Sequence, residues 1–191
     1  MSDLPAAAAW RHVDVRQGFE VLFLRRENAG YRFAGHSTGF EEGEAWGIRY
    51  DIVLDSTWTT RSAQVVGQSR WGAHDIRLEA DGAGRWTING APAPELAGCL
   101  DVDLEASAFT NALPVNRLRL RVGERAEAPA AYVRAVDLRL ERLEQIYVRV
   151  DDDRADSRYD YEAPELEFTC RLVYDRFGLV LDYPGIAVRV A

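Results

Sequence analysis

Three carboxylates alternate with apolar residues over residues 100–105 of the chain. On a β-strand Asp101, Asp103 and Glu105 share one face, with successive carboxylates about 6.5–7 Å apart. A similar spacing separates the general acid from the general base in inverting glycosidases. Asp101 and Asp103 are therefore candidate catalytic residues of a hydrolase, and they are also candidates for the polar lining of a ligand cavity.

A structural role explains the same carboxylates. Three arginines alternate with apolar residues over residues 117–122, and an antiparallel pairing of this segment with residues 100–105 places opposite charges side by side. The expected pairs are Asp101 with Arg121, Asp103 with Arg119 and Glu105 with Arg117. Exposed cross-strand ion pairs contribute about 0.2–1 kcal/mol each. The carboxylates thus form a cross-strand ladder, line a cavity or take part in catalysis, and the ladder is the favoured interpretation.

Aromatic residues form a second set of candidates. Tyr and Trp combine an apolar body with one polar tip, which suits the stacking on sugar rings and the lining of a cavity, as well as core packing. Asn111 belongs to a loop over residues 110–114 and either stabilises a turn or contacts a ligand at a barrel mouth. With Asp101 and Asp103, the candidate ligand-binding residues are Tyr50, Trp58, Arg61, Trp86, Asn111, Tyr147, Tyr161 and Tyr183.

Motifs for other chemistry are absent from the sequence. His12, His36 and His74 lack the spacing of a zinc site, so no metal site is predicted. The chain carries no nucleophile elbow, P-loop or dinucleotide fingerprint, so we expect no cofactor and recognise no nucleophile. Cys99 and Cys170 lack CxxC spacing, and we expect them to be small buried apolar residues rather than a disulfide.

The elements that position these residues are predicted to be β-strands. Apolar residues alternate with polar ones over residues 48–55, where Ile48, Tyr50, Ile52 and Leu54 share one face. Turn signals such as Asn89-Gly90 separate similar runs. We therefore expect an all-β fold, a many-stranded antiparallel β-barrel or barrel-like roll with little helix, in a single domain spanning residues 1–191. Residues 135–146 are expected to be extended, and residues 106–116 have room for a helical turn.

Composition limits the partners. The 31 acidic and 23 basic residues give a formal net charge of −8, which repels nucleic acid and anionic lipid headgroups. All the basic residues are arginines. The amino terminus does not resemble a secretory signal, and no apolar stretch is long enough to span a bilayer. We therefore expect a soluble, cytoplasmic protein that binds no nucleic acid, and homo-oligomerisation stays open.

Four blocks of sequence resemble a known bacterial family. They are YDIVLD at residues 50–55, WTTR at 58–61, DGAGRWTINGAPAPELAGCLDVDLEASAFTNALP at 81–114 and FGLVLDYPG at 177–185. In this order they resemble the family named "Putative glycolipid-binding", from about Trp46 to the carboxyl terminus. The resemblance implies a many-stranded β-barrel, similar in shape to the carriers of lipoproteins in the periplasm, and a lipid-like ligand. Asp182 and Tyr183 fall on motif positions, and Arg61 is one partner that a buried Asp182 would have.

Three functions follow from these observations. The favoured one is a non-catalytic binding or carrier protein that holds a lipid, glycolipid or similar amphipathic molecule in a barrel cavity. The first alternative is a hydrolase-type enzyme that uses Asp101 or Asp103 in the same cavity. The second is a filled barrel that acts through its surface.

Overall fold

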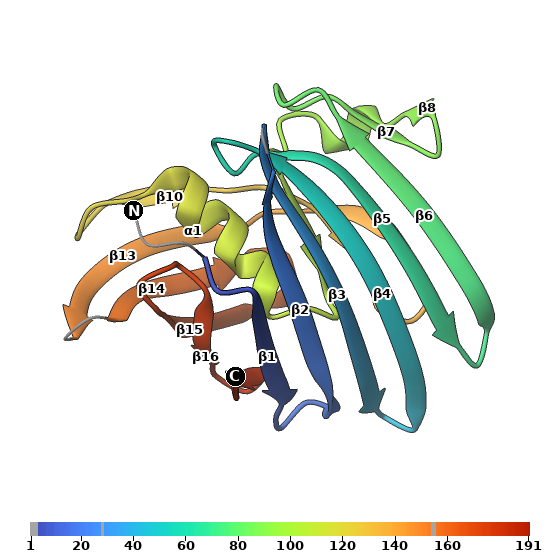
Figure 1. Cartoon of the computed structure of the whole chain (residues 1–191), viewed down its shortest axis with the longest axis horizontal. Helices are drawn as coiled ribbons and strands as arrows, with labels where there is room; N and C mark the ends of the chain where they lie inside the picture. The colour runs from blue at the N-terminus through green and yellow to red at the C-terminus, as the bar shows by residue number, and fades with distance from the viewer. Residues whose placement is uncertain (1–3, 28, 154–155) are drawn as a thin grey trace.

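The computed structural model describes residues 4–27, 29–153 and 156–191. In the amino-terminal half each strand pairs antiparallel with the next, which produces one curved sheet (Figure 1). The strands are β1 (Ala7–His12), β2 (Gln17–Glu27), β3 (Gly30–Glu41), β4 (Glu44–Asp55), β5 (Thr60–Ser69), β6 (Gly72–Ala80), β7 (Trp86–Ile88) and β8 (Ala91–Pro92).

A second antiparallel run lies in the carboxyl-terminal half. It contains β10 (Arg125–Glu127), β13 (Ile146–Asp153), β14 (Asp156–Ala163), β15 (Phe168–Tyr174), β16 (Val180–Tyr183) and β17 (Ala187–Arg189). These strands pair in sequence order, except that β10 pairs directly with β13.

The two runs join where β1 pairs with β17, and we call this pairing the seam. Three residue pairs form it: Trp10 with Arg189, Arg11 with Val188 and His12 with Ala187. The Trp10 indole nitrogen also donates to the Val180 carbonyl oxygen at 2.8 Å. Within the described residues, the resulting fourteen-stranded sheet runs from β10 to β8 without closing. The predicted antiparallel, barrel-like all-β fold with little helix is confirmed, and its barrel is open.

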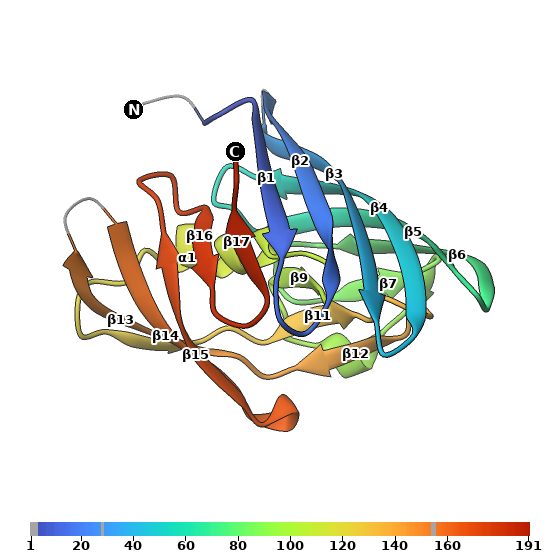
Figure 2. The same cartoon turned by 90° about the horizontal axis from the view of Figure 1, so that it is seen from below.

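A small sheet and short helices accompany the large sheet. The small sheet has β11 at its centre, with β9 parallel on one side and β12 antiparallel on the other. Figures 1 and 2 show α1 on the concave side of the large sheet. The bounds are β9 (Asp101–Leu104), β11 (Ala130–Val133), β12 (Leu140–Leu143), α1 (Ala112–Leu118) and the 3-10 helices η1 (Pro94–Leu96), η2 (Phe109–Asn111) and η3 (Pro164–Leu166).

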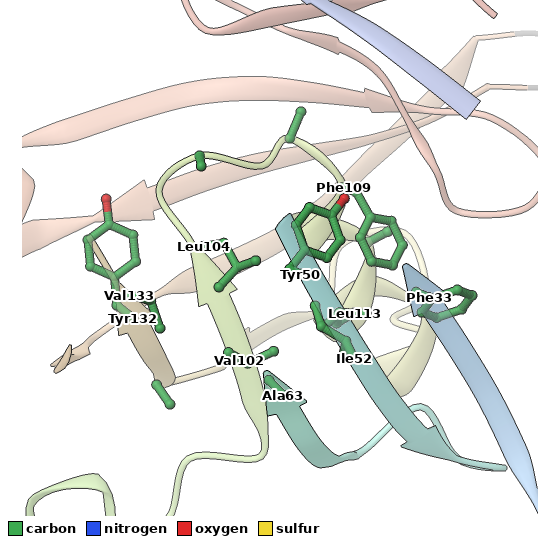
Figure 3. Close-up of a cluster of buried hydrophobic side chains, with 14 of the residues drawn as sticks. Phe33, Tyr50, Ile52, Ala63, Val102, Leu104, Phe109, Leu113, Tyr132 and Val133 are labelled. Atoms are coloured by element: carbon green, nitrogen blue, oxygen red, sulfur yellow. The ribbon is translucent and has the colours of Figure 1, made fainter. Parts of the chain in front are cut away.

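Alternating burial builds the core. Ile48, Tyr50, Ile52 and Leu54 of β4 are all buried, as their period of two predicts. Figure 3 shows Tyr50 and Ile52 beside residues of β9 and of the helical segment, such as Phe109. Side chains thus fill much of the interior. Asn89 and Gly90 both have positive φ, as expected for a tight hairpin turn.

The predicted ladder between residues 100–105 and 117–122 is wrong. Residues up to Leu118 belong to α1, and Arg119 follows with a φ of 49°. The short alternating pattern was overridden because the helix buries Leu113 and Val115, and because Pro114 lies in the first helical turn, where proline is tolerated. The helical turn allowed within residues 106–116 is present, and β9 pairs with β11 instead.

The expectation for residues 135–146 is correct only in part. Residues 135–137 form a turn and Leu138 has a φ of 54°, whereas β12 occupies residues 140–143 and β13 begins at Ile146. Both cysteines are free, and Cys99 is buried while Cys170 is half-buried.

Candidate functional site

A pocket of about 240 Å³ lies where the small sheet, the helical segment and the carboxyl-terminal strands meet; we call it the first pocket. Four of the candidates identified from sequence line it, although they come from distant parts of the chain: Asp103, Asn111, Tyr161 and Tyr183. Their role in binding stays a prediction. The pocket combines a polar floor with a charged and partly apolar rim.

Asp103 is the carboxylate of the floor. One oxygen accepts a hydrogen bond from the Thr110 hydroxyl at 2.6 Å, and the other accepts one from the Gln145 amide at 2.6 Å. Burial raises the pKa of Asp103 to about 6, and these hydrogen bonds oppose that rise. At neutral pH Asp103 is therefore ionised, and it can accept further hydrogen bonds from a ligand.

Amide and phenol groups complete the floor. The Gln145 amide also donates to the Tyr161 hydroxyl oxygen at 3.1 Å. The Tyr147 hydroxyl donates to the Asn111 side-chain oxygen at 2.9 Å, which fixes the orientation of that amide. The Tyr183 and Tyr161 rings form a T-shaped pair, with centroids 6.2 Å apart. Burial raises the pKa of Tyr161 and Tyr183, so both phenols keep their protons at neutral pH.

Arginine and glutamate side chains form the charged part of the rim. The Arg134 guanidinium contacts the Glu105 carboxylate at 3.1 Å, and Arg16 donates to the Glu105 backbone oxygen at 2.8 Å. Arg16 also lies 3.5 Å from Glu41. The positive charges beside this pocket therefore already have acidic or carbonyl partners.

Apolar side chains form the rest of the rim. Leu143 and Phe168 line the wall, and Val15 and Leu166 are 45% and 38% exposed at the same pocket. An amphipathic molecule would thus meet hydrogen-bonding groups at the floor and apolar groups near the solvent.

A buried glutamate holds the segment that carries the floor. Glu20 is fully buried, and its carboxylate accepts hydrogen bonds from the Ser107 hydroxyl, the Tyr50 hydroxyl at 2.6 Å and the Ala108 backbone N–H at 2.8 Å. Burial raises the pKa of Glu20. The sequence contained a signal for this residue, because Glu20 precedes Leu22 and Leu24 on the inward face of β2.

The other sequence candidates lie elsewhere. Asp101 is 1% exposed, and its two oxygens pair with the Arg117 guanidinium at 3.0 and 2.6 Å. Tyr50 binds Glu20, Tyr147 lies behind Asn111, and the Trp86 indole donates to the Cys99 carbonyl oxygen at 2.8 Å. Trp58 lines a separate pocket.

Arg61 and Asp182 do not form the pair that we considered. Arg61 is exposed on β5, and Asp182 is half-buried on β16. Both residues belong to the described part of the chain, and no ion pair joins them there. The described residues also contain no cluster of histidine, cysteine and acidic side chains that could hold a metal ion.

Several residues that line the pocket, or that hydrogen-bond Asp103 from behind it, escaped the sequence analysis. Gln145 lies in the short link between β12 and β13, and neither its type nor its position signalled an inward side chain. Arg16 lies in the turn between β1 and β2. Tyr132 and Arg134 reach the pocket only because β11 pairs between β9 and β12. Thr110 directly precedes Asn111 in the block of residues 81–114. This neighbour was the one sign in the sequence that Thr110 belongs to the site.

The family assignment follows from the sequence as a whole. A family model described as "Putative glycolipid-binding" matches residues 7–189. The chain belongs to this family. The resemblance of the four sequence blocks is thereby confirmed, although the family description names no specific ligand.

Solved structures of related shape support the fold. A crystal structure of a DUF1089 family protein from Pseudomonas aeruginosa is 35% identical, with a TM-score of 0.77 over 90% of this chain and 92% of that chain. A β-barrel-like protein of the DUF1849 family from Brucella abortus is 10% identical, with a TM-score of 0.52 over 96% and 92% of the respective chains, and it bears on the fold alone. No curated protein matches this member of the family.

None of the helices in the described ranges is long and apolar enough to cross a bilayer.

Proposed function

We propose that the first pocket binds the polar headgroup of a glycolipid or similar amphipathic molecule, without catalysing a reaction. The observation that carries this proposal is the polar floor beneath a partly apolar rim. Sugar hydroxyls donate to carboxylates and exchange hydrogen bonds with phenols and amides, and Asp103, Tyr161 and Asn111 offer these groups. Family membership supports the same ligand class.

The size of the pocket defines which part of the ligand it takes. About 240 Å³ is smaller than the roughly 300–1,000 Å³ typical of sites for drug-sized ligands. The headgroup therefore enters the pocket, and the alkyl part stays near Val15 and Leu166 at the mouth. A carrier that encloses whole acyl chains would need a larger cavity. Here side chains fill much of the interior.

Binding of octyl glucoside below its micellar concentration tests the proposal, with glucose and octanol as the two partial ligands. Tight binding requires both parts, so octyl glucoside should bind more strongly than either. Tyr183→Phe should weaken binding about three- to tenfold, the loss of one hydrogen bond. Tyr31→Phe is the matched control, because Tyr31 lines the separate pocket that contains Trp58. Equal binding of octanol and octyl glucoside would contradict a headgroup site.

Native mass spectrometry followed by organic extraction complements the titration. A retained lipid of defined mass would identify the natural ligand class. Its loss in Tyr183→Phe, but not in Tyr31→Phe, would link that lipid to the first pocket.

A hydrolase is the second candidate function, and one observation favours it. The pKa of Asp103 is about 6, which suits a general acid or base near neutral pH. Asp101, the second carboxylate considered for catalysis, is buried against Arg117 and does not line the pocket. Turnover of nitrophenyl glycosides or nitrophenyl esters that Asp103→Asn abolishes, with the fold intact, would establish this activity in place of simple binding.

A further inference from the structure

A second cavity, of about 440 Å³, differs from the first pocket in the charge of its lining. We call it the arginine pocket. Its walls come from residues 4–6, the end of β2, the β4–β5 turn, the end of α1 and the β15–β16 turn. In Figure 2 the tip of β2 and the β15–β16 turn both reach the upper side of the molecule. The arginine pocket shares no lining residue with the first pocket.

Among the residues that the structure describes, three arginines and no carboxylate line this cavity. Arg26, Arg119 and Arg176 are exposed, and none of them forms an ion pair with an acidic residue in the described part of the chain. The Arg119 guanidinium donates a hydrogen bond from its Nε to the Asn116 carbonyl oxygen at 3.2 Å. In a chain of net charge −8 this wall is a local reversal of sign. By contrast, Arg134 of the first pocket is paired with glutamates.

Aromatic side chains line the same cavity as the three arginines. Tyr31 and Phe177 are half-buried in the wall, and Trp58 is buried behind Tyr31 with ring centroids 4.9 Å apart. The Arg176 guanidinium lies 4.7 Å from the centre of the Phe177 ring. The cavity therefore presents positive charge next to apolar ring surface.

Two well-ordered turns hold these side chains in place. In the β4–β5 turn, Asp55 accepts hydrogen bonds from two backbone N–H groups at 2.8 and 3.1 Å, and Trp58 adopts a φ of 69° that is costly for a bulky residue. In the β15–β16 turn, Asp175 likewise accepts from two backbone N–H groups at 2.8 and 3.0 Å. The Asn116 amide links α1 to this second turn through the Gly178 carbonyl at 3.3 Å.

We propose that the arginine pocket binds a phosphate monoester carried by an aromatic or alkyl group. A phosphate monoester has a charge of about −1.5 to −2 at neutral pH and three acceptor oxygens, which matches three guanidinium forks better than a carboxylate does. Tyr31 and Phe177 contact the apolar group. The site is distinct from the headgroup site proposed above and does not depend on it.

Phenyl phosphate is the first probe, with phenol and inorganic phosphate as its two parts. Two-dimensional NMR of the arginine Nε–H and tryptophan indole N–H signals reports where each probe binds. We expect phenyl phosphate to shift the signals of Arg119, Arg176 and Trp58, and to bind more tightly than either part. Dihexanoyl phosphatidic acid tests whether the phosphate belongs to a lipid.

Charge-removing variants inside and outside the pocket test the assignment. The double substitution Arg119→Gln/Arg176→Gln removes two of the three forks, and we expect the Kd of phenyl phosphate to rise at least about tenfold. Arg25→Gln is the control, because Arg25 is an exposed arginine next to Arg26 that does not line the pocket. We expect less than about a threefold change there, since only long-range attraction is lost.

Each outcome decides the proposal. Tighter binding of phosphatidic acid than of phenyl phosphate supports a lipid source of the phosphate, and the reverse order supports a soluble phosphate ester. The proposal is overturned if neither phosphate probe binds, or if phenol binds as tightly as phenyl phosphate. Equal affinities of the double variant and Arg25→Gln, or probe-induced shifts at Arg16 and Arg134 instead, would also overturn it.

Discussion

Replacing Asp103 by Asn should change how the stability of the protein depends on pH. Asp103 is 7% exposed, and burial raises its pKa from 3.8 to about 6. The unfolded chain releases this proton near pH 4, whereas the folded protein keeps it until about pH 6. Between these values the folded state holds the extra proton, so stability falls as pH rises.

The size of the effect follows from the same two values. The gap between 3.8 and about 6 corresponds to about 3 kcal/mol of unfolding free energy, which is present below pH 4 and lost above pH 6. Asn cannot release a proton in this range. The stability of the wild-type protein minus that of Asp103→Asn should therefore decrease by about this amount between pH 4 and pH 6.5.

Urea denaturation at a series of pH values measures this difference, in which groups common to both proteins, such as Glu20, cancel. Asp81→Asn is a control of opposite sign, because backbone hydrogen bonds from Ala83 and Arg85 lower the pKa of Asp81 to about 2. Its difference curve should rise between about pH 2 and pH 4 and stay nearly flat above pH 4, so the series of pH values must extend to about pH 2. A flat curve for Asp103→Asn between pH 4 and 6.5 would refute the assignment of a buried carboxyl group with a raised pKa to the pocket floor.

Two further substitutions test the supports around the first pocket. Arg117→Met should destabilise the protein by about 3–5 kcal/mol in chemical denaturation, because it leaves the Asp101 carboxylate buried without its partner. The double variant Asp101→Asn/Arg117→Met should recover most of this loss, and a double variant as unstable as Arg117→Met would refute the explanation. Glu20→Ala should cost about 1–3 kcal/mol for each donor left without an acceptor. Amide exchange should then accelerate over residues 105–111. Unchanged exchange there would show that Glu20 does not hold this segment in place.

The sequence predicted the fold class because long alternating segments leave few alternatives. In β4 an inward apolar residue at every second position matches only a strand with one buried face. Only Arg117 and Leu118 of the alternating segment 117–122 are helical, and they end α1, which is seven residues long. Its packing against the large sheet decided the outcome, and that packing depends on elements distant in sequence.

The candidate site was predictable only where residue type itself was informative. Asp103 and Tyr161 attracted attention as a carboxylate and an amphipathic ring, and they lie at one pocket. Gln145 was missed because its approach to Asp103 depends on the link between two sheets. The charge of the arginine pocket could not be inferred either, since Arg26, Arg119 and Arg176 belong to segments that only the tertiary fold brings together.

The seam between β1 and β17 has a consequence for folding during protein synthesis. β1 leaves the ribosome early, but its partner becomes available only after residue 189 has been made. At 5–20 residues per second the intervening segment takes roughly 10 to 35 s to synthesise, and one edge of β1 stays unpaired throughout. The nascent chain must therefore protect an open strand edge from aggregation, and closure of the seam should be the last step of folding.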